Sequence, residues 1–193
     1  MMRIITGRAR GMKLETLEGD MTRPTSERAK MAIFSSLQFE LEGRRVLDLF
    51  AGSGQMGLEA VSRGAAHAVL VDQSKDAVRI IRRNAEKTRL DGDCTVVCSD
   101  FAEFLRQRRG KEPFDLVFID PPYGMKACRA AVEAILENRL LKPRGILVLE
   151  SAEPDPLGVG TPISERFEVL KSARYGVACV TILTPVAVGE GQA

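Results

Sequence analysis

Short apolar segments alternate with longer amphipathic segments between residues 45 and 150, and this alternation is the strongest constraint on the fold. The apolar segments are rich in Val, Ile and Leu, as strands buried on both faces of a sheet are. They span 46–50, 68–72, 95–99, 116–120 and 146–150, and helices are expected between them near 56–63, 74–90, 101–109 and 127–140. The alternation predicts an α/β fold with a mostly parallel sheet and helices on both faces.

The two ends of the chain depart from this alternation. Residues 3–17 place turn glycines between two apolar stretches and predict a small β-hairpin, which a helix follows. Near the other end, 167–170 and 177–183 predict two strands with a short link, and such strands pair antiparallel. We therefore expect an N-terminal extension over 1–40, a main domain over 41–185 and a flexible tail over 186–193.

Composition excludes several classes of function. A chain of 193 residues suits one α/β domain. Its charge is nearly balanced, with 28 Lys and Arg against 26 Asp and Glu. There is no apolar run long enough for a transmembrane helix and no apolar leader, so a cytoplasmic protein is expected. A single His67 and four cysteines without a C-x-x-C pair argue against a metal site.

A glycine-rich segment follows the first predicted strand and opens the next helix. Gly52, Gly54 and Gly57 satisfy G-x-G-x-x-G, and Asp72 follows Gly52 by 20 residues at the end of the second strand. Glycines allow a tight turn and close backbone approach to a ligand, and such an acid can bind ribose hydroxyls. The pattern predicts a nucleotide-type cofactor at the carboxyl edge of the sheet. A turn that binds no ligand is the alternative.

Asp48 distinguishes between two cofactors that this pattern allows. It lies inside the first apolar strand, four residues before Gly52. A carboxylate repels the pyrophosphate of NAD but favours the ammonium and sulfonium groups of S-adenosylmethionine. A dehydrogenase would also need a substrate domain, and only 43 residues follow Glu150. In the alternative interpretation, Asp48 is a buried acid hydrogen-bonded to nearby backbone amides.

The sequence Asp120-Pro121-Pro122-Tyr123 follows the fourth predicted strand directly. Two prolines remove two amide donors, so the sheet ladder must stop there. The Asp120 side chain and the Pro121 carbonyl can then act as paired acceptors beside the flat ring of Tyr123. This arrangement suits an exocyclic amine on a nucleic-acid base, held for in-line attack on a methyl group without a metal or an imidazole. A turn that only ends a strand is the alternative.

Together, the Asp48 to Gly54 segment, Asp72 and the Asp-Pro-Pro-Tyr sequence resemble the amino-group class of S-adenosylmethionine-dependent methyltransferases. A closer resemblance, over nearly all of 3–184, is to the bacterial 16S ribosomal RNA guanine-966 N2-methyltransferases. The segments that carry it are 3–5, 10–14, 23–28, 50–54, 57–60 and 62–65, together with Phe34.

The resemblance implies a Rossmann-like class I methyltransferase fold with a seven-stranded sheet, and S-adenosylmethionine as the cofactor, converted to S-adenosylhomocysteine, with no metal. It implies catalytic roles for Asp120, Pro121, Pro122 and Tyr123. The cofactor-binding residues that it implies are Arg23, Thr25, Asp48, Phe50, Gly52, Ser53, Gly54, Asp72, Gln73, Asp100 and Phe101.

Residues 1–13 hold four cations and no acid, and a basic hairpin suits an RNA phosphate backbone. The cations are Arg3, Arg8, Arg10 and Lys13; a merely solvated hairpin is the alternative. The expected substrate is 16S ribosomal RNA, free or in an assembling small subunit, and the expected enzyme is monomeric and independent of membranes. Other hypotheses are an N-methyltransferase acting on DNA adenine or cytosine or on another RNA, an NAD-binding oxidoreductase, and a non-catalytic RNA-binding assembly protein.

Overall fold

The structure is a computed structural model, and it describes residues 2–17, 27–122 and 125–187. Arg23, Thr25, Tyr123 and most of the predicted tail lie outside the described residues. The strands are β1 (Arg45–Asp48), β2 (His67–Asp72), β3 (Cys94–Cys98), β4 (Phe114–Ile119), β5 (Leu141–Ser151), β6 (Phe167–Tyr175) and β7 (Ala178–Pro185). The α-helices are α1 (Glu27–Ser36), α2 (Gln55–Ser62), α3 (Lys75–Thr88), α4 (Phe101–Gln107) and α5 (Met125–Glu137).

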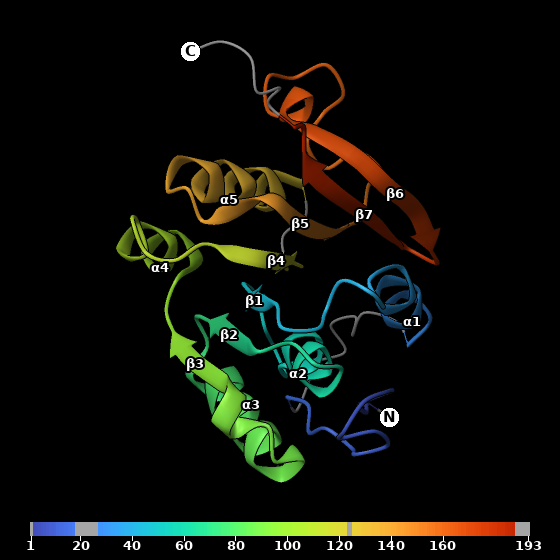
Figure 1. Cartoon of the computed structure of the whole chain (residues 1–193), viewed down its shortest axis with the longest axis vertical. Helices are drawn as coiled ribbons and strands as arrows, with labels where there is room; N and C mark the ends of the chain where they lie inside the picture. The colour runs from blue at the N-terminus through green and yellow to red at the C-terminus, as the bar shows by residue number, and fades with distance from the viewer. Residues whose placement is uncertain (1, 18–26, 123–124, 188–193) are drawn as a thin grey trace.

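The strands form one seven-stranded sheet in the order β3-β2-β1-β4-β5-β7-β6 (Figure 1). Neighbours from β3 to β5 pair parallel, whereas β7 pairs antiparallel with both β5 and β6. The predicted mostly parallel sheet and its antiparallel C-terminal hairpin are therefore confirmed. The hairpin turns back at Gly176, so β7 lies between β5 and β6.

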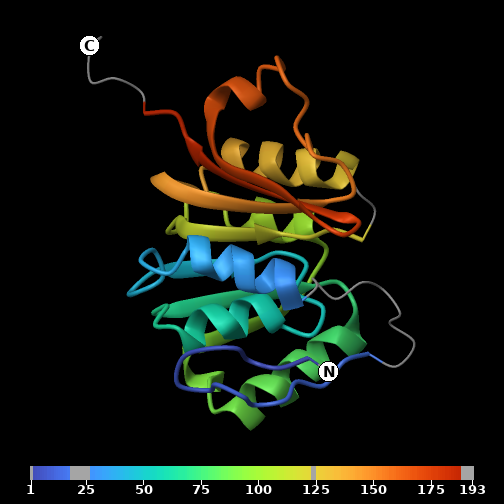
Figure 2. The ribbon, with the colours of Figure 1, turned by 90° about the vertical axis from the view of Figure 1, so that its right-hand side faces the viewer.

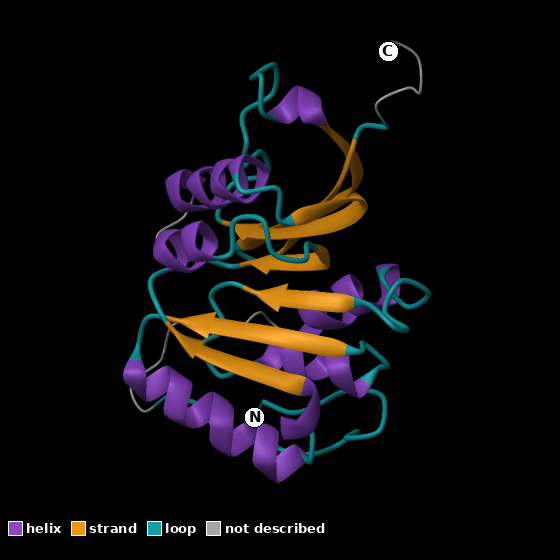
Figure 3. Ribbon diagram, turned by 60° about the vertical axis from the view of Figure 1, so that its left-hand side comes forward, coloured by secondary structure: helices purple, strands orange, loops and turns teal. Residues whose placement is uncertain are grey.

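Each face of the sheet has its own hydrophobic core because successive side chains along a strand point to opposite faces. On one face, β-strand residues such as Phe118 and Val148 pack with α1, α2 and α3, and the Phe34 and Phe118 rings lie 5.7 Å apart. On the other face, Val117 and Leu149 pack with α4 and α5. Figure 3 shows the sheet between these two helix layers, as predicted.

The order of the strands reverses between β1 and β4. The chain moves outward from β1 to β3, then crosses to the other side of β1 to form β4 and continues to β5. The crossover helices therefore leave β1 and β4 on opposite faces, and a crevice opens where their carboxyl ends lie side by side. Leu47 pairs with Val117 and Asp48 with Phe118, so the two strands end at nearly the same level.

The N-terminal segment forms the predicted hairpin, with an antiparallel bridge between Arg3 and Lys13, but it contains no regular strands within 2–17. The Ile4 amide donates to the Met12 carbonyl at 2.9 Å and the Leu14 amide to the Met2 carbonyl at 3.0 Å, and the turn between them also donates hydrogen bonds to α2. The Arg8 amide donates to the Ser62 carbonyl at 2.8 Å, and the Ala9 amide donates to Ser62 Oγ at 3.0 Å. At Gly7, a Cβ would lie 1.8 Å from the Ser62 carbonyl oxygen, so this approach requires glycine.

A fully buried carboxylate, Glu59 in α2, attaches the hairpin to the main domain. It accepts the Ile5 amide at 2.7 Å and the Thr6 amide at 2.9 Å. It also pairs with Lys30 of α1 at 2.9 Å and with Arg63 at 2.8 Å. Four donors on one buried group compensate for its lost hydration. Glu59 therefore joins the hairpin, α1 and α2, which lie together on one side of the sheet in Figure 2.

We expect Glu59→Gln to lower the free energy of unfolding by about 3–5 kcal/mol, because buried Lys30 would lose its counter-charge. In addition, the new side-chain NH2 group would point at hydrogen-bond donors that the carboxylate accepts. Urea unfolding followed by circular dichroism measures this change. Glu86→Gln, at an exposed position of α3, is the matched control and should shift stability by less than about 0.5 kcal/mol. Equal effects of the two substitutions would contradict the role of Glu59.

Candidate active site

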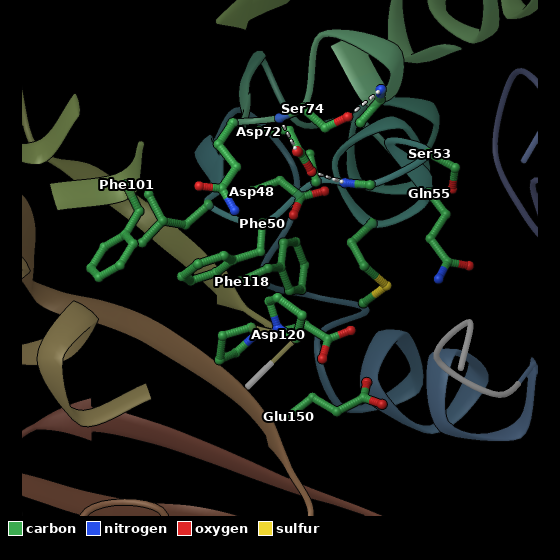
Figure 4. A pocket seen from close by; sticks show the side chains of 18 of the residues that line it. Asp48, Phe50, Ser53, Gln55, Asp72, Ser74, Phe101, Phe118, Asp120 and Glu150 are labelled. Carbon is green, nitrogen blue, oxygen red and sulfur yellow. Dashed lines mark hydrogen bonds between the residues drawn. The ribbon is translucent and has the colours of Figure 1, made fainter. Parts of the chain in front are cut away.

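A cleft of about 740 Å³ opens at the carboxyl edge of the sheet, where the strand order reverses (Figure 4). Its size is typical of sites for small molecules and cofactors. Loops that follow β1, β2, β3 and β4 line it, together with the end of β5 and the start of β7. The predicted residues in its wall are Asp48, Phe50, Gly52, Ser53, Asp72, Gln73, Asp100, Phe101, Asp120, Pro121 and Pro122.

Gly54 differs from the other predicted cofactor residues because it is buried and is not among the residues that line the cleft. It precedes α2 with φ of 81°, and a Cβ there would approach Leu70 Cδ2 to 3.1 Å. At Gly57 a Cβ would lie 2.8 Å from the same atom. These two glycines therefore serve the tight turn and the packing of α2 against β2, while Gly52 lies in the cleft wall.

Asp48 is buried at the end of β1, where its Oδ2 accepts the Gly57 amide at 2.9 Å. The alternative interpretation of Asp48, a buried acid bonded to a backbone amide, therefore describes this contact, and the residue also lines the cleft. Burial raises the pKa of Asp48 to about 7; the Gly57 hydrogen bond lowers this pKa and the charge of Asp72 raises it. The group can therefore change charge near neutral pH when a cation binds beside it.

Asp72 joins the glycine-rich loop to the start of α3. Its Oδ2 accepts the Gly52 amide at 2.9 Å, and its Oδ1 accepts the Ser74 amide at 2.8 Å. Each carboxylate oxygen has a second lone pair, so Asp72 can accept further hydrogen bonds from hydroxyl groups in the cleft. Figure 4 shows Asp72 and Asp48 in the same part of the cleft.

Asp100 and Phe101 form the wall beyond β3. Asp100 caps α4, since its Oδ1 accepts the amides of Ala102 at 2.9 Å and Glu103 at 3.2 Å. The rings of Phe50 and Phe101 lie 5.2 Å apart and are tilted by 47°. The two rings give this part of the cleft an apolar surface that can receive a planar group.

The Asp-Pro-Pro segment lies across the cleft from the glycine-rich loop. β4 ends at Ile119, and the half-buried Asp120, the buried Pro121 and the exposed Pro122 follow it. The Asp120 carboxylate borders the cleft on the side away from Asp72 (Figure 4). The structure thus brings the predicted cofactor loop and the predicted catalytic segment, 66 residues apart between Gly54 and Asp120, into one cleft.

The sequence reasoning missed Glu150 as a site residue. It lies near the end of β5, is 8% exposed and lines the cleft close to Asp120. A signal existed, because Glu150 ends a run of apolar residues just as Asp120 does at the end of β4. The prediction treated Glu150 only as a strand boundary.

Asn84 was also missed, although it positions one wall of the cleft. Its side chain is fully buried on the apolar face of α3. Asn84 Nδ2 donates to the Ser53 carbonyl at 2.9 Å and to the Glu15 carbonyl at 3.0 Å, and Oδ1 accepts the Glu15 amide at 2.8 Å. Asn84 therefore ties the glycine-rich loop to the end of the hairpin, where Thr16 and Leu17 line the cleft. An amide at a core position of an amphipathic helix was the available signal.

The four predicted RNA-binding cations lie outside the cleft wall within the described residues. Arg3 pairs with Glu27 at 2.9 Å, and Arg8 pairs with Asp93. The hairpin turn contacts Ser62, at the far end of α2 from the cleft, so Arg8 lies toward the opposite edge of the sheet. Arg10 and Lys13 are exposed and have no ion pair among residues 2–17, 27–122 and 125–187.

The remaining candidates for chemistry have structural roles or none. His67 is the first residue of β2, and its Nε2 contacts Thr95 Oγ1 at 2.8 Å. Cys98 is exposed and Cys128 is buried. In the described part of the chain, no group of three or more His, Cys, Asp or Glu side chains could hold a metal ion. Nor does that part contain a helix long and apolar enough to cross a membrane.

The strand order and the cleft at its reversal define a Rossmann-like methyltransferase fold. The solved Escherichia coli protein yhhF, provisionally described as a methyltransferase, superposes with a TM-score of 0.84 at 26% identity, covering 96% of this chain and 98% of that one. The model of the family described as Conserved hypothetical protein 95 matches residues 2–184, and the chain belongs to this family.

Curated relatives agree with this assignment. The Haemophilus influenzae protein named ribosomal RNA small subunit methyltransferase D is 32% identical over 177 residues, which cover 91% of this chain and 90% of the relative. An Escherichia coli protein of the same name is 33% identical over 150 residues, 78% of this chain and 74% of the relative. The resemblance identified from the sequence motifs is therefore confirmed at the level of the family.

The raised pKa of Asp48 implies that the stability of the ligand-free protein depends on pH. Folded Asp48 has a pKa of about 7, whereas an unperturbed Asp carboxyl has a pKa of 3.8, so between these pH values the folded state holds a proton that the unfolded chain releases. The free energy of unfolding should therefore fall as pH rises through this window. Asp48→Asn removes the titration and keeps an oxygen for the Gly57 amide. We expect the variant to gain roughly 2–4 kcal/mol relative to wild type between about pH 4 and pH 8.

Urea unfolding at a series of pH values measures this difference. Asp91→Asn, at an exposed position, is the control and should follow wild type throughout. A constant offset between Asp48→Asn and wild type across the window would show that the Asp48 carboxyl titrates normally.

Proposed function

We propose that this protein transfers a methyl group from S-adenosylmethionine to the exocyclic N2 amine of a guanine in 16S ribosomal RNA, releasing S-adenosylhomocysteine. The observation that carries the proposal is a single cleft with an acidic, glycine-lined half beside β1 and β2 and an Asp-Pro-Pro segment opposite it. The names of the Haemophilus influenzae and Escherichia coli relatives support ribosomal RNA as the substrate.

The first half of the cleft fits the charges of S-adenosylmethionine. Asp48 and Asp72 supply two carboxyl groups near a backbone loop, and a cationic ligand beside Asp48 would favour its ionised form. A pyrophosphate would meet repulsion from the same groups, which disfavours NAD. Asp72 can accept ribose hydroxyls, and the rings of Phe50 and Phe101 can receive the adenine. When bound, the cofactor supplies an electrophilic methyl group on its sulfonium.

The second half of the cleft holds the amine. The Asp120 carboxylate and the Pro121 carbonyl accept its two hydrogens, which orients the nitrogen lone pair toward the methyl donor. The same acceptors stabilise the positive charge that develops on nitrogen as the new bond forms. The amine therefore need not lose a proton beforehand; its proton leaves afterwards, when the nitrogen is cationic and far more acidic.

The target base must leave its stack to bring N2 into the cleft. We propose that Tyr123 receives the ring face and that Arg23 and Thr25 close over the cofactor; all three lie outside the described residues. The hairpin supplies the RNA contact away from the cleft through Arg10 and Lys13. The proposed enzyme is a cytoplasmic monomer that acts on RNA alone or on an assembling small subunit.

We expect Asp120→Ala to reduce the rate of methyl transfer by at least about 100-fold, because the amine loses its charged acceptor. Transfer of labelled methyl groups to small-subunit particles from a strain lacking this protein measures the rate. The affinity for S-adenosylmethionine, measured by calorimetry, should change less than about threefold. Asp72→Ala is the comparison variant and should weaken that affinity by about 10-fold or more.

A near-normal rate for Asp120→Ala on these particles would contradict the assigned role of Asp120. Stabilisation of the wild-type protein by NAD but not by S-adenosylmethionine in a thermal melt would instead support the oxidoreductase hypothesis. Wild-type protein that binds RNA and S-adenosylmethionine but transfers no methyl group would support a non-catalytic assembly protein.

Reversing the free charges of the hairpin tests the RNA interface. We expect Arg10→Glu with Lys13→Glu to raise the KM for RNA by about 10-fold at physiological salt and leave kcat unchanged, since phosphate contacts supply affinity rather than chemistry. The slope of the logarithm of RNA affinity against the logarithm of salt concentration should decrease by about 2, as expected for the loss of two phosphate contacts. Arg109→Glu with Lys111→Glu, exposed cations beyond α4, is the control. Equal effects of both pairs would leave the hairpin without a specific role.

A further inference from the structure

We propose that Glu150 sets the base specificity of the site by accepting the N1–H of the guanine whose amine is held by Asp120. This inference rests on the proposed function and extends it to a residue that the sequence motifs do not include. It follows from the register of two strands, the burial of the carboxylate and the donor pattern of the bases.

The register of β4 and β5 places the two acids side by side. Phe118 pairs with Val148 and Ile119 with Leu149 in parallel, so Asp120, the first residue after β4, lies next to Glu150 of β5. Neighbouring strands lie about 4.8 Å apart, and alternate residues of a strand point to one face. Glu150 therefore shares the face of Val148. Figure 4 shows both carboxylates directed into the same end of the cleft.

Glu150 is largely buried in the wall of the cleft. Only 8% of the residue is exposed, and that surface faces the cleft. The Cys128 thiol, behind the sheet edge, donates to the Glu150 carbonyl at 3.5 Å. Burial, with contributions from the charges of Asp120 and Glu150, raises the pKa of that thiol to about 12. One buried side chain thus senses both carboxylates, consistent with their adjacency.

The bases differ in what lies beside the exocyclic amine. In guanine the neighbouring ring position is N1–H, a donor, so its edge presents a continuous row of donors. In adenine and cytosine the ring nitrogen beside the amine carries a lone pair and accepts. Two neighbouring acceptors therefore match guanine, whereas the lone pair of adenine or cytosine would face the Glu150 carboxylate and be repelled. The pair of acids selects guanine by attraction and rejects the other amino bases by repulsion.

RNA carrying 2-aminopurine at the target position separates this contact from the chemistry. 2-Aminopurine keeps the N2 amine, but its N1 is an acceptor and it lacks O6. We expect wild-type protein to methylate guanine RNA with a kcat/KM about 10- to 100-fold above that of 2-aminopurine RNA. Glu150→Gln should narrow this ratio at least about fivefold, because an amide can donate to the unprotonated N1 and has no charge. Any loss of kcat/KM that comes from the missing O6 would remain in Glu150→Gln. A smaller ratio between the two RNAs in the variant therefore reports on the contact to N1 alone.

Two further measurements keep the outcomes distinct. Glu153→Gln, at an exposed position near Glu150, is the control and should keep the wild-type ratio. The affinity for S-adenosylmethionine, measured by calorimetry, should be unchanged in Glu150→Gln. The proposal would be overturned if Glu150→Gln lost affinity for the cofactor and slowed the methylation of both RNAs by the same factor. That result would indicate that Glu150 serves cofactor binding or stability of the fold.

The wild-type protein also tests the inference if the variant fails to fold. Equal rates on guanine and 2-aminopurine RNA would overturn the assignment of Glu150 while leaving the proposed methyl transfer intact. Failure to methylate guanine RNA at all would overturn the proposed function itself. A high ratio of kcat/KM for guanine RNA over 2-aminopurine RNA in wild type, and a lower ratio in Glu150→Gln, would support both the proposed methyl transfer and the role of Glu150.

Discussion

The side-by-side placement of β1 and β4 is the constraint on which the rest of the structure depends. Their crossover helices lie on opposite faces, so no helix covers the point where both strands end. The glycine-rich loop after β1 and the Asp-Pro-Pro segment after β4 meet there because each begins where its strand stops. β5 extends the same edge and brings Glu150 beside Asp120. The two halves of the proposed active site thus arise from one reversal in strand order.

Five carboxyl groups line this cleft, and their concentration shapes its chemistry. Asp48 and Asp72 lie beside the glycine-rich loop, Asp100 follows β3, and Asp120 and Glu150 lie across from the loop. Burial, with a smaller contribution from the negative charge of Asp72, raises the pKa of Asp48 to about 7. Binding of a cationic cofactor and of amine and imino donors on a base would relieve the same repulsion. The acidic cleft is therefore complementary to a ligand that brings positive charge or hydrogen-bond donors into it.

Buried polar contacts attach the N-terminal hairpin to the main domain, and the hairpin does not pair with the seven-stranded sheet. Glu59 holds its amides against α1 and α2, while Asn84 connects its end to the glycine-rich loop. The segment that carries exposed cations is thereby rigidly joined to the wall that lines the cleft. Under the proposed function, this connection would couple the position of bound RNA to the geometry around the cofactor.

Much of this protein was predictable from its sequence, because local patterns determine local structure. Apolar runs separated by helices predicted β1 to β5, two further apolar runs with a short link predicted β6 and β7, and the spacing of Gly52, Gly54 and Asp72 predicted a glycine-rich loop at the cleft. The tertiary structure alone decided which strand ends became neighbours, since pairing and crossover direction depend on packing across the whole sheet. It made Asp48 a buried group with a raised pKa, held the turn of the hairpin against α2, and set Glu150 beside Asp120. A single residue's place in the sequence carries no signal for such contacts between distant segments.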